Sequence, residues 1–327
     1  MGELSLSFAC LPYDRLQPLL SGEVRVEGAN LVPMISRWPL EIFSRMLTHN
    51  AFDVAEMSIT HAFVLTAAQT ANFVVLPIFP SRAFRHGFIF INRKAGIHGP
   101  KDLEGKTIGI QGHQATAAVW IRGILRNDHD VVFDDVNWLE GGVNQRGVKG
   151  GSAAMLRPNR PISVRRIRDD QMLSEMLATG EIDALINPEI PDSLKTSADV
   201  GRLFPGYHAL ERDYYQRTGV FPIMHVLVMK RELHEQHRWL ASSIFRACQA
   251  AKALALKQAH YSGALAYMLP WLYESLEELD EVFGDDPWPY GLQSNRQTLE
   301  TYAQILLDEG FLSKPARIED FFVAVEE

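Results

Sequence analysis

A short charged segment carries two arginines and a histidine, Arg82, Arg85 and His86, between two apolar runs. The runs, residues 73–78 and 88–91, have the composition of strands, so the charged segment is expected to leave one strand and cross to another. Guanidinium groups bind carboxylates through paired N–H donors, and an imidazole can carry a proton near neutral pH. The segment predicts an acid-binding loop; the alternative is that the arginines are solvated loop charges and the histidine is a core residue.

Another group of polar side chains follows the first expected strand. Residues 4–10 alternate as a strand does, and Tyr13, Asp14 and Arg15 come directly after it. Ligands in open α/β sheets usually bind at the carboxyl ends of strands, so these three side chains are candidates for a binding site. The alternative is an ordinary helix start with Asp14 as its cap.

Two further strands are expected to end on polar residues. Residues 52–58 have the composition of a buried strand with Glu56 and Ser58 at its end, and residues 181–188 repeat the pattern with Asn187 at the end. Two lobes of similar build would each offer such a strand end to a shared cleft. The repeat is too short to establish a duplication.

Residues 107–110 are expected to form a short strand, and the polar residues His113, Gln114 and Thr116 precede an apolar helical stripe. A helix start directs backbone N–H groups and the positive end of its dipole at whatever lies in front of it. This order predicts a carboxylate or phosphate site, although a helix start without a ligand is the alternative. The three-glycine dinucleotide motif and the P-loop ending are both missing, so we do not expect a nucleotide.

Length and composition set the class of protein. A chain of 327 residues exceeds what one hydrophobic core usually serves, and 46% hydrophobic with 22% charged residues is ordinary for a globular protein. The net charge of −8 and the absence of basic runs argue against nucleic-acid binding. The first residues have no features of a signal peptide, no apolar run approaches the roughly 18 residues of a membrane helix, and two cysteines favour a reduced protein. We therefore expect a cytoplasmic location with no membrane contact.

The expected organisation is an α/β protein of two lobes. The first lobe combines residues 1–92 and 222–327, and the second comprises residues 93–221, because glycines and a proline follow residue 92 and a strand resumes after residue 222. A short hairpin is expected at residues 22–33. The glycine-rich residues 139–161 are interpreted as a surface loop, with a lid as the alternative, and the aromatic residues 285–291 receive no assigned role.

Five segments match a known family in the same order along the chain. The chain resembles the 4,5-dihydroxyphthalate decarboxylase family in residues 13–15, 52–58, 79–86, 116–125 and 218–225. Residues 113–115 and 141–151 depart from what the closest members would have. The resemblance implies a type 2 periplasmic-binding-protein-like fold, with two lobes joined by two crossover strands and the ligand in the cleft between them.

The reaction implied by the resemblance is decarboxylation of a dihydroxylated phthalate to protocatechuate, a carbon–carbon lyase reaction. Direct loss of carbon dioxide would leave an aryl carbanion, so a base must remove a phenolic proton while an acid protonates the ring carbon. We expect His86 to be the acid, and Glu56 or His225 to be the base. The carboxylates would be held by Arg82, Arg85, Arg15 and the helix start at residues 114–116, with Tyr13, Ser58, His113 and Asn187 as further substrate-binding candidates.

Cofactors and rival functions remain to be weighed. No cofactor is required by this chemistry, and Glu56, His61, His86, His113 and His225 lack the short fixed spacing of a metal site, although a divalent metal is an open alternative. The expected partner is a small aromatic dicarboxylate, and a homo-oligomer is left open. The rivals are a binding protein that delivers a small acid to a transporter, and another enzyme of this fold, such as a chorismate dehydratase. Pyrimidine synthases are disfavoured because their cysteine-rich motif is missing.

Overall fold

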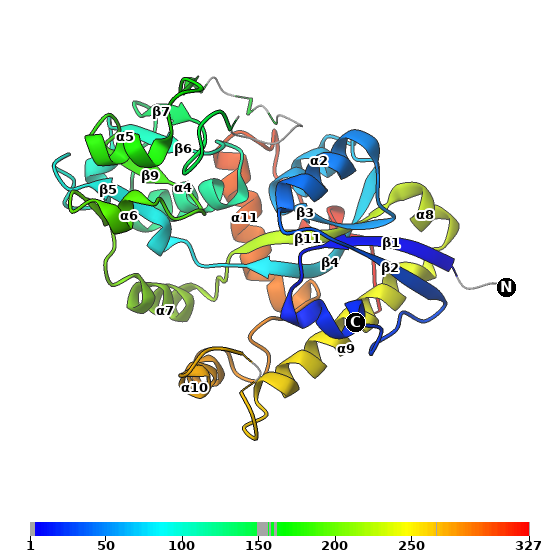
Figure 1. The fold of residues 1–327 in the computed structure, drawn as a ribbon. Coiled ribbons are helices and arrows are strands. Elements are labelled where there is room, and N and C mark those ends of the chain that lie inside the picture. Colours follow the sequence, from blue (N-terminus) through cyan, green and yellow to red (C-terminus); the bar gives the residue numbers. More distant parts are fainter. Residues whose placement is uncertain (1–3, 149–155, 157, 160–161, 266, 327) are drawn as a thin grey trace. The chain divides into compact units, whose positions relative to one another are not determined.

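The computed structural model describes residues 4–148, 156, 158–159, 162–265 and 267–326 (Figure 1). The chain forms two compact units. Unit 1 comprises Met1–Arg82, Ile223–Glu300 and Ala316–Glu327, and unit 2 comprises Ala83–Pro222 and Thr301–Pro315. Each unit is an α/β structure with its own sheet.

The sheet of unit 1 has five strands in the order β2-β1-β3-β11-β4. Its strands are β1 (Leu4–Cys10), β2 (Ala29–Ile35), β3 (Val54–Ser58), β4 (Phe73–Arg82) and β11 (Ile223–Lys230). β1 pairs in parallel with β2 and β3, whereas β11 lies antiparallel between β3 and β4. All five residues of β3 are buried, as expected for a strand covered on both faces.

The helices of unit 1 follow the apolar periodicity of the sequence. They are α1 (Gln17–Leu20), α2 (Pro39–His49), α3 (Ile59–Ala67), α8 (Arg231–Gln236), α9 (Trp239–Ala259) and α10 (Leu272–Phe283), with short 3₁₀ turns at Asp14–Leu16, Gln293–Asn295 and Ile318–Asp320. Pro39 begins α2 at a position that needs no N–H donor, and Asn50 ends it in the left-handed conformation, at φ 47°. The stripe of α9 that includes Leu240, Ile244 and Cys248 is buried. Cys10 and Cys248 are both free and buried.

The sheet of unit 2 has six strands in the order β10-β5-β9-β6-β7-β8. They are β5 (Ile89–Asn92), β6 (Thr107–Ile110), β7 (Asn137–Glu140), β8 (Val164–Arg166), β9 (Ala184–Ile186) and β10 (Val200–Arg202). The helices are α4 (Thr116–His129), α5 (Leu173–Thr179), α6 (Ser193–Thr196) and α7 (Tyr207–Thr218), with 3₁₀ turns at His86–Phe88 and Pro100–Leu103. β6, β7 and β8 pair in parallel, which requires crossover connections.

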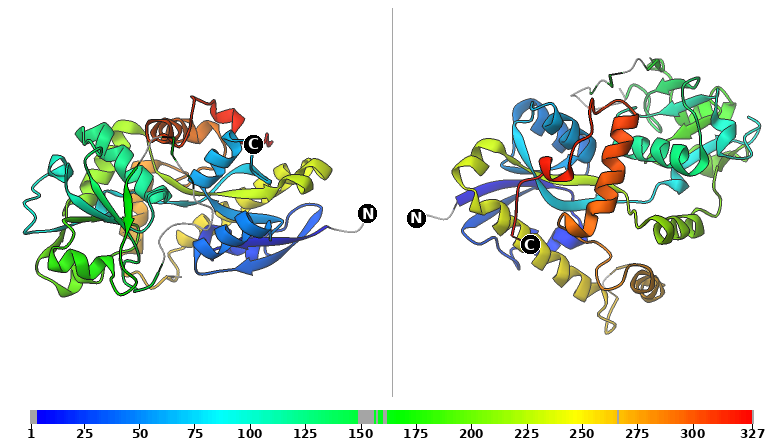
Figure 2. Two further views of the ribbon diagram at one scale, coloured as in Figure 1. Left: turned by 90° about the horizontal axis from the view of Figure 1, so that it is seen from above. Right: turned by 180° about the vertical axis from the view of Figure 1, so that it is seen from behind.

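The last long helix, α11 (Arg296–Asp308), begins in unit 1 and ends in unit 2. Beyond Glu300 it packs against α4 of unit 2 (Figure 2). The rings of Trp120 and Tyr302 stack there with centroids 4.7 Å apart. Gly123 allows this approach, because a Cβ atom there would lie 2.6 Å from Ile305 Cγ1.

Two expectations about the organisation are corrected. The structure puts residues 83–92 in unit 2, since β5 pairs with β9 and β10, and it puts residues 301–315 there through the contacts of α11. The hairpin expected at residues 22–33 is limited to a single antiparallel bridge between Val26 and Ala29, because β2 pairs in parallel with β1 along its whole length. The segment that includes α1 supplies the crossover that parallel pairing needs.

Much of the glycine-rich segment interpreted as a surface loop, with a lid as the alternative, lies outside the described residues. Among the helices that the structure describes, none combines the length and the apolar composition that crossing a bilayer requires.

Candidate active site

A connected polar cluster of unit 1 surrounds the carboxylate of Glu56, which is fully buried on β3. Tyr13 Oη donates a hydrogen bond to Glu56 Oε1 over 2.6 Å, and the Leu11 backbone N–H donates to Oε2 over 3.0 Å. His225 Nδ1 lies 2.5 Å from Glu56 Oε1. A buried carboxylate needs such donors, and β1, β3 and β11 each contribute one side of the cluster.

The register of the sheet explains why these residues meet. β3 and β11 pair antiparallel, with Ser58 opposite His225 and Glu56 opposite Leu227. Glu56 and His225 are therefore diagonal neighbours, a spacing that long side chains span. Tyr13 reaches the same carboxylate from the loop that follows β1.

Glu56 and His225 differ in their hydrogen bonds and in their exposure to solvent. Glu56 Oε1 accepts the proton of His225 Nδ1, which directs the free pair of electrons of the imidazole to Nε2. The His225 side chain is 17% exposed, whereas Glu56 is fully buried, so a ligand can reach only the histidine. Phe43 packs edge-on against the imidazole with centroids 5.0 Å apart. Such an arrangement can serve as an oriented general base.

Tyr13 takes part as a donor and not as an acid. Burial, together with the charge of Glu56 and the hydrogen bond to it, raises the pKa of the Tyr13 hydroxyl well above its usual value. The hydroxyl therefore keeps its proton at neutral pH and holds the carboxylate in place.

Arg15 and Arg82 donate to protein oxygens within unit 1. Arg15 Nε donates to Pro80 O over 2.7 Å, and its guanidinium lies between the rings of Tyr13 and Trp288, 4.2 and 4.1 Å from their centroids. Arg82 is 6% exposed, and its Nη2 donates to Asn295 Oδ1 and, over 2.7 Å, to Pro289 O.

The aromatic loop at residues 285–291 has a role that sequence reasoning missed. The pairing of β4 with β11 is irregular between Leu76 and Ser81, where Pro77 and Pro80 have no N–H to donate. Gly291 N donates to Pro77 O over 2.8 Å, and Trp288 Nε1 donates to Phe79 O over 2.9 Å. The loop satisfies the carbonyl groups that the strand pairing leaves exposed.

The other charged residues of the predicted acid-binding loop lie in unit 2. His86 is 2% exposed, and its Nδ1 lies 3.7 Å from Glu211 Oε1 with the ring of Tyr214 packed at 5.0 Å. Within the described parts of the chain, neither ring nitrogen has a hydrogen-bond partner. Arg85 lies over the Phe88 ring, 4.9 Å from its centroid, and burial lowers the pKa of its guanidinium to about 10 although Glu211 opposes the shift.

The remaining predicted binding residues of unit 2 surround the start of α4 and the end of β9. Thr116 is the first residue of α4 and is buried, as is Gln114, whose Oε1 accepts the Leu156 N–H. His113 O accepts a hydrogen bond from Arg122 over 2.9 Å. Asn187 is 1% exposed and its Nδ2 donates to Glu189 O.

The structure thus brings together Tyr13, Glu56 and His225, with Ser58 beside them in the pairing with β11. Ser58 Oγ lies 3.3 Å from His61 Nδ1. His86, Arg85, His113, Gln114, Thr116 and Asn187 belong to unit 2. In the described residues, no group of three or more histidine, cysteine or carboxylate side chains could hold a metal ion.

Comparison with known proteins gives two kinds of relative. No protein-family model matches the chain. A 4,5-dihydroxyphthalate decarboxylase from Comamonas testosteroni is 33% identical over 331 residues, which cover 98% of this chain and 99% of that protein. A 4,5-dihydroxyphthalate decarboxylase from Pseudomonas putida is 40% identical over 191 residues, which cover 58% of this chain and 73% of that protein.

Solved structures agree on the fold alone. The periplasmic aliphatic sulphonate binding protein SsuA from Escherichia coli has a TM-score of 0.54 at 12% identity and covers 98% of each chain. The alkanesulfonate-binding protein SsuA from Xanthomonas axonopodis pv. citri, bound to MOPS, has a TM-score of 0.51 at 12% identity and covers 99% of each chain. The periplasmic-binding-protein-like fold expected from the sequence is confirmed. The near-complete match to the Comamonas enzyme shows that this chain belongs to the 4,5-dihydroxyphthalate decarboxylase family.

Proposed function

We propose that this chain is a carboxy-lyase that converts 4,5-dihydroxyphthalate to protocatechuate and carbon dioxide. The observation that carries the proposal is the 33% identity with a named decarboxylase over 98% of the chain. The oriented histidine of unit 1 supports it, because the reaction needs a base that can take a proton near neutral pH.

The chemistry sets what the site must supply. Loss of carbon dioxide from an aromatic carbon is blocked until that carbon becomes tetrahedral, because the departing electron pair otherwise stays in the ring plane. Removal of the proton from the hydroxyl para to the carboxylate sends electron density to that carbon, which an acid then protonates. Carbon dioxide leaves as the ring regains its aromaticity.

We assign the base to His225 and the positioning of its ring to Glu56. His225 Nε2 would accept the phenolic proton, while Glu56 Oε1 holds Nδ1 and stabilises the imidazolium that forms. Tyr13 and the Leu11 N–H fix the carboxylate of Glu56. The assignment to His225 in place of Glu56 is favoured by the 17% exposure of the histidine beside a fully buried carboxylate.

We keep His86 as the proposed proton donor and Arg85 as a proposed carboxylate ligand. Glu211, 3.7 Å from His86, would pair with the ring in its charged form. Burial lowers the pKa of the Arg85 guanidinium to about 10, so an anion bound beside it would stabilise its charged form. This supports Arg85 as a carboxylate ligand. Arg15 and Arg82 donate to protein carbonyls, so we assign them to positioning the strand ends.

Cofactor independence is also a proposal. The proton transfers above need an acid and a base, and neither step requires an electron sink outside the substrate. We further propose a cytoplasmic location, which the two free, buried cysteines support.

The test is turnover of 4,5-dihydroxyphthalate by the purified chain, with carbon dioxide release and chromatographic identification of the product, with and without a chelator. Protocatechuate at equal rates in both samples is the expected result. Tight binding of the substrate without turnover would identify a binding protein instead. Neither binding nor turnover would point to another substrate, and loss of turnover with chelator would overturn cofactor independence.

A further inference from the structure

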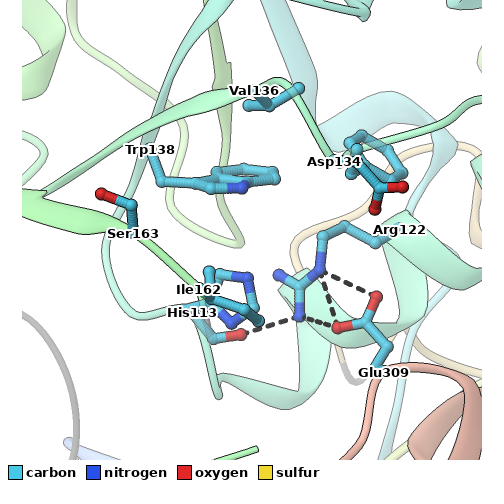
Figure 3. Close-up of a pocket in the computed structure, with 9 residues that line it drawn as sticks. His113, Arg122, Asp134, Val136, Trp138, Ile162, Ser163 and Glu309 are labelled. Atoms are coloured by element: carbon cyan, nitrogen blue, oxygen red, sulfur yellow. Dashed lines mark hydrogen bonds and ion pairs between the residues drawn. The ribbon is translucent and has the colours of Figure 1, made fainter. Parts of the chain in front are cut away.

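Unit 2 contains a polar cavity that the proposed reaction does not use. Its volume is about 240 Å³, and it is lined by residues of α4 and β7, by residues just before α4, β7 and β8, and by the first residue after α11 (Figure 3). One wall is apolar and includes Phe133, Val136 and Trp138, and the opposite side carries Arg122. Arg122 and Glu309 are each 1% exposed.

The guanidinium of Arg122 has one donor left over. Its Nε and Nη2 donate to the Glu309 carboxylate, and Nη2 also donates to His113 O. Nη1 is buried and, in the described portion of the chain, has no hydrogen-bond partner. Figure 3 shows this nitrogen on the side of the guanidinium away from Glu309, beneath the ring of Trp138 and toward His113. A buried donor without an acceptor is costly, so the cavity favours a ligand that brings an acceptor to it.

The local charge favours an anion. Arg126 Nη2 lies 3.4 Å from the same Glu309 carboxylate, so two guanidinium groups share one buried carboxylate. The excess of one positive charge matches a ligand with a single negative charge. Asp134 also lines the cavity, but it is exposed to solvent, which screens its charge.

The volume of the cavity and the residues that line it indicate the size and the polarity of the ligand. A cavity of roughly 150 Å³ lined by apolar side chains can hold benzene, so this one has room for a single ring with a substituent. The Trp138 and Phe133 rings, with centroids 5.8 Å apart, form an aromatic wall for it. The exposed Ser163 hydroxyl at the rim is a second donor.

We propose that this cavity binds a single-ring aromatic monocarboxylate, with one carboxylate oxygen on Arg122 Nη1 and the ring against Trp138. This proposal does not rest on the decarboxylase activity. Benzoate is the probe, measured by calorimetry and by NMR, with benzyl alcohol as the matched neutral compound. We expect nuclear Overhauser effects between the benzoate ring protons and the Trp138 indole, and weaker binding of benzyl alcohol.

Arg122→Lys keeps a positive charge for Glu309 and removes Nη1, so benzoate affinity at this site should fall about tenfold or more, as for the loss of a charge-assisted hydrogen bond. Arg146→Lys is the control, because Arg146 is an exposed arginine of unit 2 that pairs with Glu175 and does not line the cavity. Benzoate should bind this variant as tightly as it binds the wild type. Val136→Phe, which fills the cavity, should abolish the Trp138 signals and keeps the test valid if Arg122→Lys fails to fold. Benzoate that gives no contact with Trp138, or that binds Arg122→Lys as it binds wild type, would overturn the proposal.

Discussion

At the scale of single residues, the decisive contrast in unit 1 is between a carboxylate that no ligand can reach and a histidine that one can. His225→Ala should lower kcat for 4,5-dihydroxyphthalate by about 10²–10⁴-fold, the usual contribution of a general base. His260→Ala is the matched control, since His260 is a partly exposed histidine of the same unit that contacts Asp280. Equal turnover in the two variants would remove His225 from the mechanism.

The Tyr13 hydroxyl should matter to stability as well as to turnover. Tyr13→Phe removes a donor to the buried Glu56 carboxylate, and a hydrogen bond to a charged group contributes about 1.5–3 kcal/mol. Urea unfolding should show a loss of this size, whereas Tyr261→Phe, at a residue that is 66% exposed, should change the free energy of unfolding by less than about 0.5 kcal/mol. A Tyr13→Phe protein as stable as wild type would mean that Glu56 finds another donor.

Single residues were predicted best where they end a strand. Tyr13 and Glu56 follow apolar runs whose period identifies the strands, and the carboxyl ends of neighbouring parallel strands lie at one edge of a sheet. The contact between Glu56 and His225 depends on the antiparallel register of β3 and β11, 169 residues apart, which no local pattern encodes. The sequence therefore identified His225 as a candidate without showing which residues it contacts. The structure shows that it contacts Glu56.

At the scale of elements, β4 is held by hydrogen bonds from Trp288 and Gly291, which lie far along the chain. Trp288→Phe removes the donor to Phe79 O and leaves a smaller aromatic ring beside Arg15, so the lost hydrogen bond should cost about 1 kcal/mol in the free energy of unfolding. Trp271→Phe, at a side chain that is 74% exposed, is the control. If both variants unfold at the same urea concentration, the aromatic loop does not hold β4.

Because α4 packs closely against α11, Gly123→Ala should change the free energy of unfolding in the direction opposite to that expected from helix propensity. Gly123→Ala would favour an isolated helix by about 1 kcal/mol, yet the added methyl group would overlap Ile305 and should destabilise the protein by about 1–3 kcal/mol. The Ile305→Ala background should relieve the overlap, so a double-mutant cycle by thermal unfolding should show strong coupling. Additive effects would contradict the contact.

The elements themselves were predicted from period and composition, while their partners were not. The strands at Leu4–Cys10 and Thr107–Ile110 were expected from the sequence and are confirmed. The hairpin expected at residues 22–33 is limited to one bridge because glycine and proline indicate a turn without saying which strand comes next. No local pattern shows that Trp288 and Gly291 donate hydrogen bonds to the carbonyl groups of Phe79 and Pro77.

At the scale of the whole molecule, the chain passes between the units at residues 82–83, 222–223, 300–301 and 315–316. The first two passages follow the composition of the sequence closely enough to be anticipated within about ten residues. The last two lie within or just after α11. The apolar stripe of this helix indicates that it packs in a hydrophobic core, but not whether that core belongs to unit 1 or to unit 2. Arg122 and Glu309 went unnoticed for the same reason, since they are 187 residues apart.

The stability of unit 2 should therefore depend on residues 301–315, which belong to it although they lie near the end of the chain. Tyr302→Ala empties the stack on Trp120 and should destabilise unit 2 by about 3–5 kcal/mol, the usual cost of removing a large buried ring. Amide hydrogen exchange should speed up in β6 and β7 and change little in β1 and β3. Equal acceleration in both units would mean that they unfold as one.

The two natural thiols lend themselves to spectroscopy. Burial, with the charge of Glu56 as a second cause, raises the pKa of Cys10 well above its usual value, and burial alone raises that of Cys248 to about 12. Thiolates are the reactive species, so neither cysteine should take up a maleimide label in the native protein. A cysteine introduced at one exposed position in each unit would then be labelled alone, and spin or fluorophore pairs would report the separation of the units as 4,5-dihydroxyphthalate is added.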